Sequence, residues 1–400
     1  MLRGMLCALI LVVGTQVAAG RAEFQANEHT AHDQTEPAVA MNETGDFIVA
    51  WRSDTADGRG GGVYARYFDA DGTPMGEEFQ VAGAGVDVAS WSPGVGISAD
   101  GHAVVAWVGV DNGNRDILAR LFDRQGRPLT DAFVVNALPD EAMQSAPCVS
   151  MNGTGNFVVV WASSVSEEQV VRTYVAGRIY NADGSPASEE LSVEDHAQAR
   201  WPEVAMDDSG RFVVSWIRMG DTFNRPYGEY VKYRRFDADG TALGPAVALT
   251  GDLNSRWYGP SVAVTPEGDF SIAWAIGPFP YDILMQSFDS QGTSVTEPYI
   301  INTCLDGNQG HPCVAGNGAG EYLVVWDSQK QNGDCQDVFG QLCNSRGELH
   351  GGELALNSYM ADRQWYPDAA MAPDGTYVVV WTSENQDGSG YGIFGETGAR

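Results

Sequence analysis

The sequence predicts an all-β protein, a seven-bladed β-propeller with four antiparallel strands in each blade. One observation is a proline–glycine–tryptophan frame that occurs seven times, with the proline 14 and the glycine 6 residues before the tryptophan. A second is the distance between successive tryptophans, which stays between 52 and 58 residues. A third is that every unit divides into four short strand-like runs without helical periodicity. A fixed period of this length with four strands per unit is typical of propeller blades.

The frame keeps both spacings in all seven copies. The repeat tryptophans are Trp51, Trp107, Trp161, Trp216, Trp274, Trp326 and Trp381. The repeat prolines are Pro37, Pro93, Pro147, Pro202, Pro260, Pro312 and Pro367. The repeat glycines are Gly45, Gly101, Gly155, Gly210, Gly268, Gly320 and Gly375.

Each unit predicts strands A to D in order. Strand A reads P-x-V-A-M, as in Pro37–Met41, so we expect the proline to begin it. A polar turn with the repeat glycine follows, because glycine accepts the positive φ of tight hairpins. Strand B is apolar and β-branched up to the tryptophan, as in FVVVW, which predicts burial on both faces. Strand C resembles VYARYFDADG and strand D resembles EEFQVA in the first unit.

The two ends of the chain predict a closed ring. The seventh unit stops at Arg400 after strand C and has no strand D of its own. Residues Glu23–Asn27 read EFQAN and match the strand D sequence EFQVA of the first unit. We therefore expect residues 23–27 to supply the fourth strand of the last blade, which removes two exposed sheet edges.

Residues 1–22 have the pattern of a secretory signal peptide. Arg3 precedes a short apolar run at 6–13, and cleavage after Ala19 or Ala22 fits the small residues there. The apolar run is too short to span a bilayer. We expect a secreted protein, extracellular or periplasmic, with one propeller domain over residues 23–400.

The composition restricts the partners. Asp and Glu number 53 against 23 Lys and Arg, a formal net charge of −30. Such a field repels nucleic acid and anionic membrane surfaces, so neither is an expected partner. We expect a monomer that is soluble in a salty exterior, and no membrane insertion.

The repeat resembles the units of secreted bacterial propeller proteins, which read roughly W-x-S-x-x-x-D-G-S-G-Y-G-I-x-G. The segment Trp381–Glu396, WTSENQDGSGYGIFGE, carries the resemblance most clearly. The resemblance covers the chain from about residue 23 and implies an architecture without fixing an activity. Repeated Trp-Asp dipeptides, kelch double glycines and integrin-type calcium loops are absent from the sequence.

Aromatic residues outside the frame gather in one class of loop. Strand alternation places the loops from strand D to the next strand A on the same face as the B–C loops, and we name this the D–A face. All four tryptophans outside the frame precede a repeat proline by one to three residues. Aromatic rings beside arginine bind sugar rings or partner proteins, whereas the alternative role is to fill gaps between blades. The candidate ligand-binding residues are Trp91, Arg200, Trp201, Arg256, Trp257, Tyr258, His311, Arg363, Trp365 and Tyr366.

Acidic B–C loops and three cysteines are further candidates. Calcium requires six to eight oxygen ligands, so these loops are weak calcium candidates beside the alternative of solvated acidic loops. The candidate metal ligands are Asp54, Asp57, Asp327, Asp334, Glu384 and Asp387. Cys304, Cys313 and Cys335 all belong to the sixth unit, and we expect one disulfide among them, with its pairing left open.

Three functions are compatible with this pattern. The first is an extracellular binding or adhesion protein that presents the aromatic D–A face to a glycan or a protein. The second is a carbohydrate-active enzyme, a glycosidase or lyase, with acidic and histidine residues at the channel mouth. The third is a structural surface or matrix component. We expect binding rather than catalysis, because no spacing in the sequence singles out a catalytic pair.

Overall fold

The computed structural model describes most of the chain from Glu23 to Ala399. The described residues are 23–54, 61–82, 87–88, 93–111, 114–137, 142–167, 170–194, 198–219, 230–249, 258–277, 279–333 and 335–399. The predicted signal peptide, residues 1–22, lies outside them. None of the described residues forms a helix that is long and apolar enough to cross a membrane.

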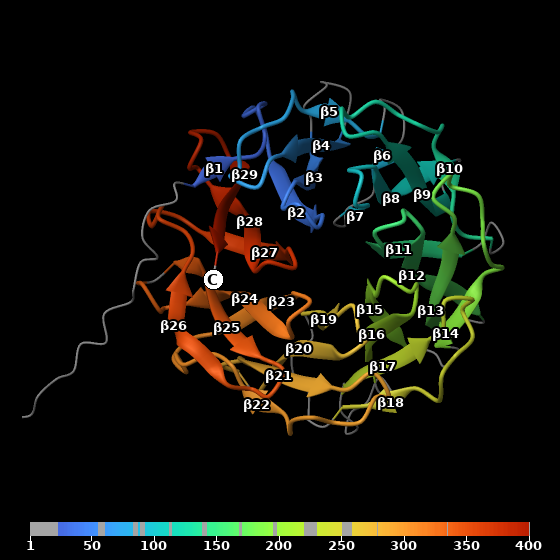
Figure 1. The fold of residues 1–400 in the computed structure, drawn as a ribbon. Helices are drawn as coiled ribbons and strands as arrows, with labels where there is room; N and C mark the ends of the chain where they lie inside the picture. Colours follow the sequence, from blue (N-terminus) through green and yellow to red (C-terminus); the bar gives the residue numbers. More distant parts are fainter. Residues whose placement is uncertain are drawn as a thin grey trace, which may run out of the picture.

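The chain forms seven antiparallel sheets arranged around a common axis, which confirms the predicted propeller (Figure 1). Strand A of each blade lies nearest the axis and strand D lies at the rim. The innermost strands are β2 (Gln34–Met41), β6 (Asp87–Val88) with β7 (Gly94–Ile97), β11 (Met143–Met151), β15 (Ala199–Met206), β19 (Ser261–Val264), β23 (Gln309–Gly316) and β27 (Gln364–Met371). The B strands are β3 (Phe47–Ser53), β8 (Ala103–Asp111), β12 (Phe157–Glu167), β16 (Phe212–Arg218), β20 (Phe270–Ile276), β24 (Glu321–Gln329) and β28 (Thr376–Glu384).

The outer half of each blade is made of strands C and D. The C strands are β4 (Gly62–Phe68), β9 (Asn114–Phe122), β13 (Val170–Tyr180), β17 (Tyr230–Phe236), β21 (Asp282–Phe288), β25 (Gln336–Asn344) and β29 (Tyr391–Ala399). The D strands are β5 (Phe79–Gln80), β10 (Phe133–Val134), β14 (Leu191–Glu194), β18 (Val247–Ala248), β22 (Tyr299–Ile300), β26 (Leu349–Ala355) and, in the last blade, β1 (Phe24–Gln25).

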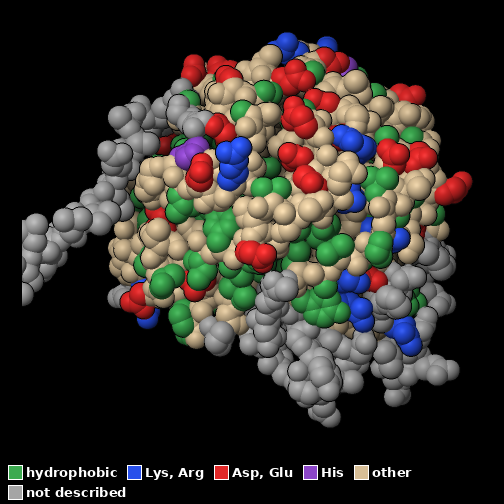
Figure 2. Space-filling model, turned by 60° about the horizontal axis from the view of Figure 1, so that its bottom comes forward, with side chains coloured by type: hydrophobic (Ala, Val, Ile, Leu, Met, Phe, Trp, Pro, Cys, Tyr) green, Lys and Arg blue, Asp and Glu red, His purple; other side chains and the backbone are tan. Residues whose placement is uncertain are grey.

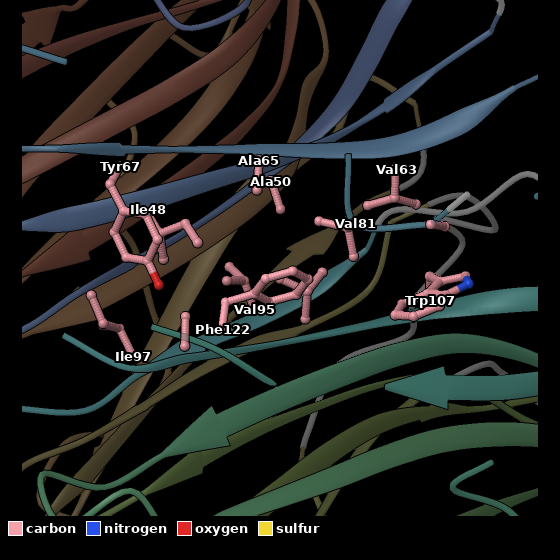
Figure 3. Packing of buried hydrophobic residues seen from close by; sticks show 13 residues of the cluster. Ile48, Ala50, Val63, Ala65, Tyr67, Val81, Val95, Ile97, Trp107 and Phe122 are labelled. Atoms are coloured by element: carbon pink, nitrogen blue, oxygen red, sulfur yellow. The ribbon is translucent and has the colours of Figure 1, made fainter. Parts of the chain in front are cut away.

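The core lies between neighbouring blades. Figure 3 shows Ile48 and Tyr67 of the first blade against Val95, Trp107 and Phe122 of the second. The seven repeat tryptophans are at most 2% exposed, and the B strands are almost wholly buried. Burial on both faces explains their apolar, β-branched sequences, since each face packs against an adjacent sheet.

The repeat proline has a different role from the one that the sequence predicts. In five blades strand A begins three or four residues before the proline, and a β-bulge lies at the proline itself. Proline has no N–H to donate to strand B, so the bulge lets the strand pass this point and resume pairing. The prediction that proline begins strand A is therefore wrong for these blades.

The amino-terminal strand closes the ring as predicted. Strand β1 pairs with β29, with Phe24 opposite Gly395. The buried Asn27 side chain accepts a hydrogen bond from the Ile393 backbone N–H at 2.7 Å. Asparagines after the D strands of three other blades accept the same bond from strand C: Asn136, Asn302 and Asn357.

We predict that Asn27→Ala lowers the stability of the whole propeller by about 1–3 kcal/mol, because the buried Ile393 N–H loses its acceptor. Urea denaturation followed by tryptophan fluorescence measures this change. Asn332→Ala, at an exposed loop position, is the control and should unfold like the wild type. Equal midpoints for both variants would contradict the closing role of Asn27.

Candidate active site

A cavity of about 490 Å³ lies on the axis, and the innermost strands line it. Six of the seven repeat prolines contribute to the lining: Pro37, Pro93, Pro147, Pro260, Pro312 and Pro367. The residue directly before the proline also lines the cavity in five blades. It is Gly259 in one of them, and in the other four it carries a side chain, as Glu36, Trp201, His311 and Tyr366. These four residues, which we name the mouth residues, combine an acid, an imidazole and two aromatic rings at one place.

The mouth residues share a strained backbone. Their φ angles are 57° at Glu36, 49° at Trp201, 45° at His311 and 52° at Tyr366. Residues with a Cβ atom disfavour this left-handed region, at a cost of about 1–3 kcal/mol each. The strain follows from the β-bulge at the proline, which turns the preceding side chain toward the axis. Strain of this kind concentrates at functional sites in proteins.

His311 is held by a buried carboxylate. Its Nδ1 lies 2.5 Å from Oδ2 of Asp327, whose side chain is 1% exposed, whereas the histidine side chain is 23% exposed. The other carboxylate oxygen of Asp327 accepts a hydrogen bond from Nε2 of Gln336 at 3.2 Å. A carboxylate at Nδ1 fixes the tautomer in which Nε2 carries the lone pair. The arrangement therefore leaves Nε2 of His311 as a base.

Two tyrosines flank the histidine. The ring of Tyr258 lies 4.6 Å from the His311 ring in an edge-on contact, and the ring of Tyr366 lies 4.2 Å from it. Burial, with a smaller contribution from Asp327, raises the pKa of Tyr258 to about 12. Burial, then the charges of Glu36 and Asp327, also raises the pKa of Tyr366. Both phenols stay protonated at neutral pH, so they are proton donors beside the base.

A glycine makes room for the first tyrosine. A Cβ atom on Gly310 would lie 2.7 Å from the Tyr258 ring, closer than real contacts allow. Gly310 is also the direct strand partner of Asp327. The residue before His311 thus sets the positions of both Tyr258 and Asp327 around the imidazole.

Glu36 brings a carboxyl group to the mouth. Burial raises its pKa, and the nearby Arg52 guanidinium opposes that rise only in part. Its Oε2 atom is buried and has no hydrogen-bond partner among the described residues. The backbone N–H of Glu36 donates to Oγ1 of Thr382 at 3.1 Å, which ties blade one to blade seven. The carboxyl group of Glu36 therefore loses its proton at a higher pH than an exposed glutamate does.

Two thiol–carboxyl pairs also line the cavity, on the strand position directly after the proline. The Cys148 thiol donates to Glu203 at 3.0 Å, and the Cys313 thiol donates to Asp368 at 3.1 Å. Burial raises the pKa of Glu203 to about 7 and also raises that of Asp368. It raises the pKa of both thiols well above their usual range, so neither cysteine is an activated nucleophile.

The structure brings part of the predicted ligand face together. His311, Tyr258 and Tyr366 form one cluster, and the Arg363 guanidinium lies 5.7 Å from the Trp365 ring. The other candidate ligand-binding residues do not join this cluster. Trp201 lines the cavity and packs on the core between blades four and five, and Arg200 is exposed on β15. Trp91, Arg256 and Trp257 lie outside the described residues.

The predicted disulfide is wrong. All five described cysteines are free thiols, including Cys304, Cys313 and Cys335. Cys313 faces the central cavity, where its thiol bonds to Asp368. The thiols of Cys304 and Cys335 instead contact the carbonyl groups of Asp306 and Ala361. Membership of one blade did not bring these three side chains together, because they lie on different parts of it.

The acidic residues that the sequence suggests as calcium ligands are either bonded to other groups, placed at the end of a strand, or outside the described residues. Asp327 orients His311, and Asp54 pairs with Arg52 at 2.5 Å. Asp387 accepts hydrogen bonds from Gln25 and from the Ser389 backbone, and Glu384 ends strand β28. Asp57 and Asp334 lie outside the described residues. The described part of the chain contains no group of three or more His, Cys, Asp or Glu side chains placed to hold a metal ion.

Charged side chains of both signs are interspersed on the face that Figure 2 shows. Figure 2 shows acidic side chains across the visible face, with basic side chains between them. The long-range field is therefore negative overall, and any preference for an anionic ligand must come from groups at the mouth.

Comparison with known proteins gives the fold alone. No protein-family model matches the chain, and no curated protein matches it. The structure of an ulvan lyase, described as a new family of polysaccharide lyase, has a TM-score of 0.59 at 10% identity, and the match covers 94% of this chain and 96% of that chain. An α-L-arabinanase from Penicillium chrysogenum gives 0.51 at 11% identity, covering 77% and 93%. The propeller domain of the Trilobed protease from Pyrococcus furiosus gives 0.52 at 9% identity, covering 92% and 94%.

The buried acids predict that stability falls as pH rises. The carboxyl of Glu203 has a pKa of 4.5 in an unfolded chain and about 7 when folded. Both states are protonated below pH 4.5, so the stability is fully present there and is lost as pH rises through 7. The change for this group is on the order of 3 kcal/mol.

Glu203→Gln removes this titration, so its melting temperature should fall less than that of the wild type between pH 5 and pH 8. The melting temperature of the variant should still fall slightly with pH, because burial raises the pKa of Asp368 as well. Glu267→Gln, at an exposed turn, is the control and should keep the slope of the wild type. Parallel curves for wild type and Glu203→Gln would contradict the assignment.

Proposed function

We propose that this protein is a secreted carbohydrate-active enzyme that cleaves an acidic polysaccharide by β-elimination at the mouth of the central cavity. The observation that carries the proposal is the His311–Asp327 pair flanked by Tyr258 and Tyr366. It places an oriented base and two protonated phenols within one cluster, as acid–base chemistry requires.

The reaction has one base and one acid. Nε2 of His311 removes the proton at C5 of a uronate, which lies α to the carboxylate. The electron pair forms the C4–C5 double bond, and the bond between C4 and the glycosidic oxygen breaks. A phenol of Tyr258 or Tyr366 gives its proton to that oxygen. Solvent then carries the proton from the imidazole back to the phenolate, which restores both groups.

Elimination fits the mouth better than hydrolysis by two carboxyl groups does. Glycoside hydrolysis generally uses two carboxyl groups on either side of the scissile bond. Among the described acids that line the cavity, Glu203 and Asp368 are each bonded to a buried thiol. The buried Oε2 atom of Glu36 has no hydrogen-bond partner among the described residues. The mouth thus supplies an oriented histidine, whereas two of its acids accept hydrogen bonds from thiols, and an oriented base is what elimination requires.

Glu36 has the chemistry to receive the substrate carboxylate. Its raised pKa widens the pH range in which the carboxyl is protonated, and a protonated carboxyl donates a hydrogen bond to a carboxylate and stabilises the charge that develops at C5. Arg52 adds a positive charge nearby. The net charge of −30 repels a polyanion at long range, but salt screens exposed charges beyond about 8 Å in physiological solution. Groups in direct contact with the substrate therefore decide its binding.

Two further points support the proposal. Solved structures of the same architecture include one named as an ulvan lyase, bound to a GlcA(1-4)Rha3S unit, and one named as an arabinanase. A propeller of this shape therefore accommodates polysaccharide chemistry elsewhere. The signal-like residues 1–22 are suited to export, which would place the enzyme where polysaccharides are found.

We predict that the wild type releases 4,5-unsaturated uronate ends from at least one of ulvan, alginate and polygalacturonate. The conjugated double bond absorbs ultraviolet light, so absorbance measures the reaction directly. His311→Ala should lose about 10²–10⁴-fold in kcat, because the base is gone. Asp327→Asn should lower kcat more than it changes KM, because it removes the carboxylate that orients His311.

The control for this experiment is His102→Ala, at an exposed turn on the opposite face. It should keep full activity. If new reducing ends appear without a double bond, the protein is a hydrolase and the lyase proposal is wrong. Saturable binding without turnover, unchanged in His311→Ala, would contradict the enzyme and favour the binding function that the sequence first suggested.

Glu36→Gln tests the protonated acid separately. The amide still donates a hydrogen bond but does not titrate, so we expect activity that no longer falls on the alkaline side where wild-type Glu36 ionises. Glu36→Ala should raise KM for the uronate polymer, because alanine has no hydrogen-bond donor for the substrate carboxylate. A pH–rate profile of Glu36→Gln that follows the wild type would show that the charge state of Glu36 has no part in the reaction.

A further inference from the structure

Aromatic rings form an unbroken row through the candidate site. Outward from His311 on one side, Tyr258 lies 5.8 Å from Tyr281, and Tyr281 lies 6.1 Å from Phe279. These are centroid distances within the range of direct ring contact. On this side the row ends at Phe279, which is 73% exposed.

The row continues on the other side of the histidine. The Tyr366 ring lies 5.5 Å from the Trp365 ring, and that ring lies 5.5 Å from the ring of Tyr391. Arg363 packs over Trp365 and brings a positive charge to this arm. The complete row, in spatial order, is Phe279, Tyr281, Tyr258, His311, Tyr366, Trp365 and Tyr391.

The row crosses three blades on the D–A face. Phe279 and Tyr281 belong to the connection between β20 and β21, and Tyr258 precedes β19. Trp365 and Tyr366 lie in β27, and Tyr391 begins β29. Each member is at least partly exposed, although rings of this size are usually buried when they serve only the core. Their alignment across blades is not part of the repeat, because it combines D–A and B–C segments.

Such a row has the chemistry of a polysaccharide-binding surface. Aromatic faces pack against the apolar C–H faces of sugar rings, and tyrosine hydroxyl groups form hydrogen bonds with sugar hydroxyls. The arms extend in both directions from His311, so a chain lying on the row places sugars on both sides of the base. A site with a single arm would instead accept only a chain end.

We infer that the aromatic row binds an extended polysaccharide across the site, so that the enzyme cleaves at internal linkages. This inference rests on the proposed function, because it assigns binding positions around the same His311. It goes beyond that function by identifying the two arms and the internal position of cleavage. The Phe279–Tyr281 arm and the Trp365–Tyr391 arm each hold sugars on one side of the cleaved bond.

Binding is measured first, in the His311→Ala background, so that cleavage does not interfere. Oligogalacturonates of two to eight units are the probes, with matched oligomers of alginate and ulvan, and calorimetry gives Kd. We expect affinity to rise with length. Phe279→Ala and Tyr391→Ala should each weaken the longest oligomer by about three- to tenfold and leave the dimer unchanged.

Leu129→Ala is the matched control, since this exposed residue lies on the opposite face. It should bind every oligomer like the parent. Affinity that does not depend on length, or loss at only one arm, would overturn the two-sided row. This result is independent of catalysis, so a failure of the lyase proposal remains distinguishable from a failure of the binding row.

Product size is measured second, with active protein and whichever polymer is cleaved. Internal cleavage gives oligomers of intermediate length early and lowers viscosity before many ends appear. Phe279→Ala with Tyr391→Ala should raise KM for the polymer more than it lowers kcat, because both rings bind sugars away from the cleaved bond. Release of only mono- or disaccharides from the first minutes would contradict internal cleavage.

Discussion

The β-bulge at the repeat proline is the constraint on which the site depends. Strand A must pair with strand B, yet proline offers no N–H at that position. The chain therefore bulges, and the residue before the proline adopts a left-handed backbone, as His311 does at φ 45°. The same event occurs in blades one, four and seven, where Glu36, Trp201 and Tyr366 turn toward the axis. A feature of the fold thus becomes a ring of positions that can carry chemistry.

The uniformity of the blades brings these positions within reach of each other. Tyr258, His311 and Tyr366 come from three successive blades at related points of the frame, and neighbouring rings meet at 4.2 to 4.6 Å. Asp327 comes from strand B of the same blade as His311, opposite Gly310 in the sheet register. Only the residues differ between blades, so the frame supplies geometry and the substitutions supply function.

The sequence predicts the ring well because spacing determines it. The frame predicts seven blades, and EFQAN predicts the closing strand. It also places Tyr258, His311 and Tyr366 on one face. It does not predict the partner of His311, since Asp327 resembles any other acidic loop residue until the β23–β24 register is known. Glu36 carries no sequence signal either, because a glutamate before proline is typical of a polar loop. Phe279 and Tyr391 were missed because their contacts depend on how the B–C connections fold.

The closing strand connects stability with the site. Left-handed residues cost about 1–3 kcal/mol each, and several lie around one cavity. Such strain persists only where the surroundings over-determine the backbone. The ring constrains the backbone because each blade packs on both of its neighbours. The pairing of β1 with β29 gives the last blade the same constraint. Tyr366 lies in that blade, and the Glu36 N–H bonds across to its Thr382. Because blades one and seven meet at the closure, its loss would release the strain first at Glu36 and Tyr366, before reaching His311.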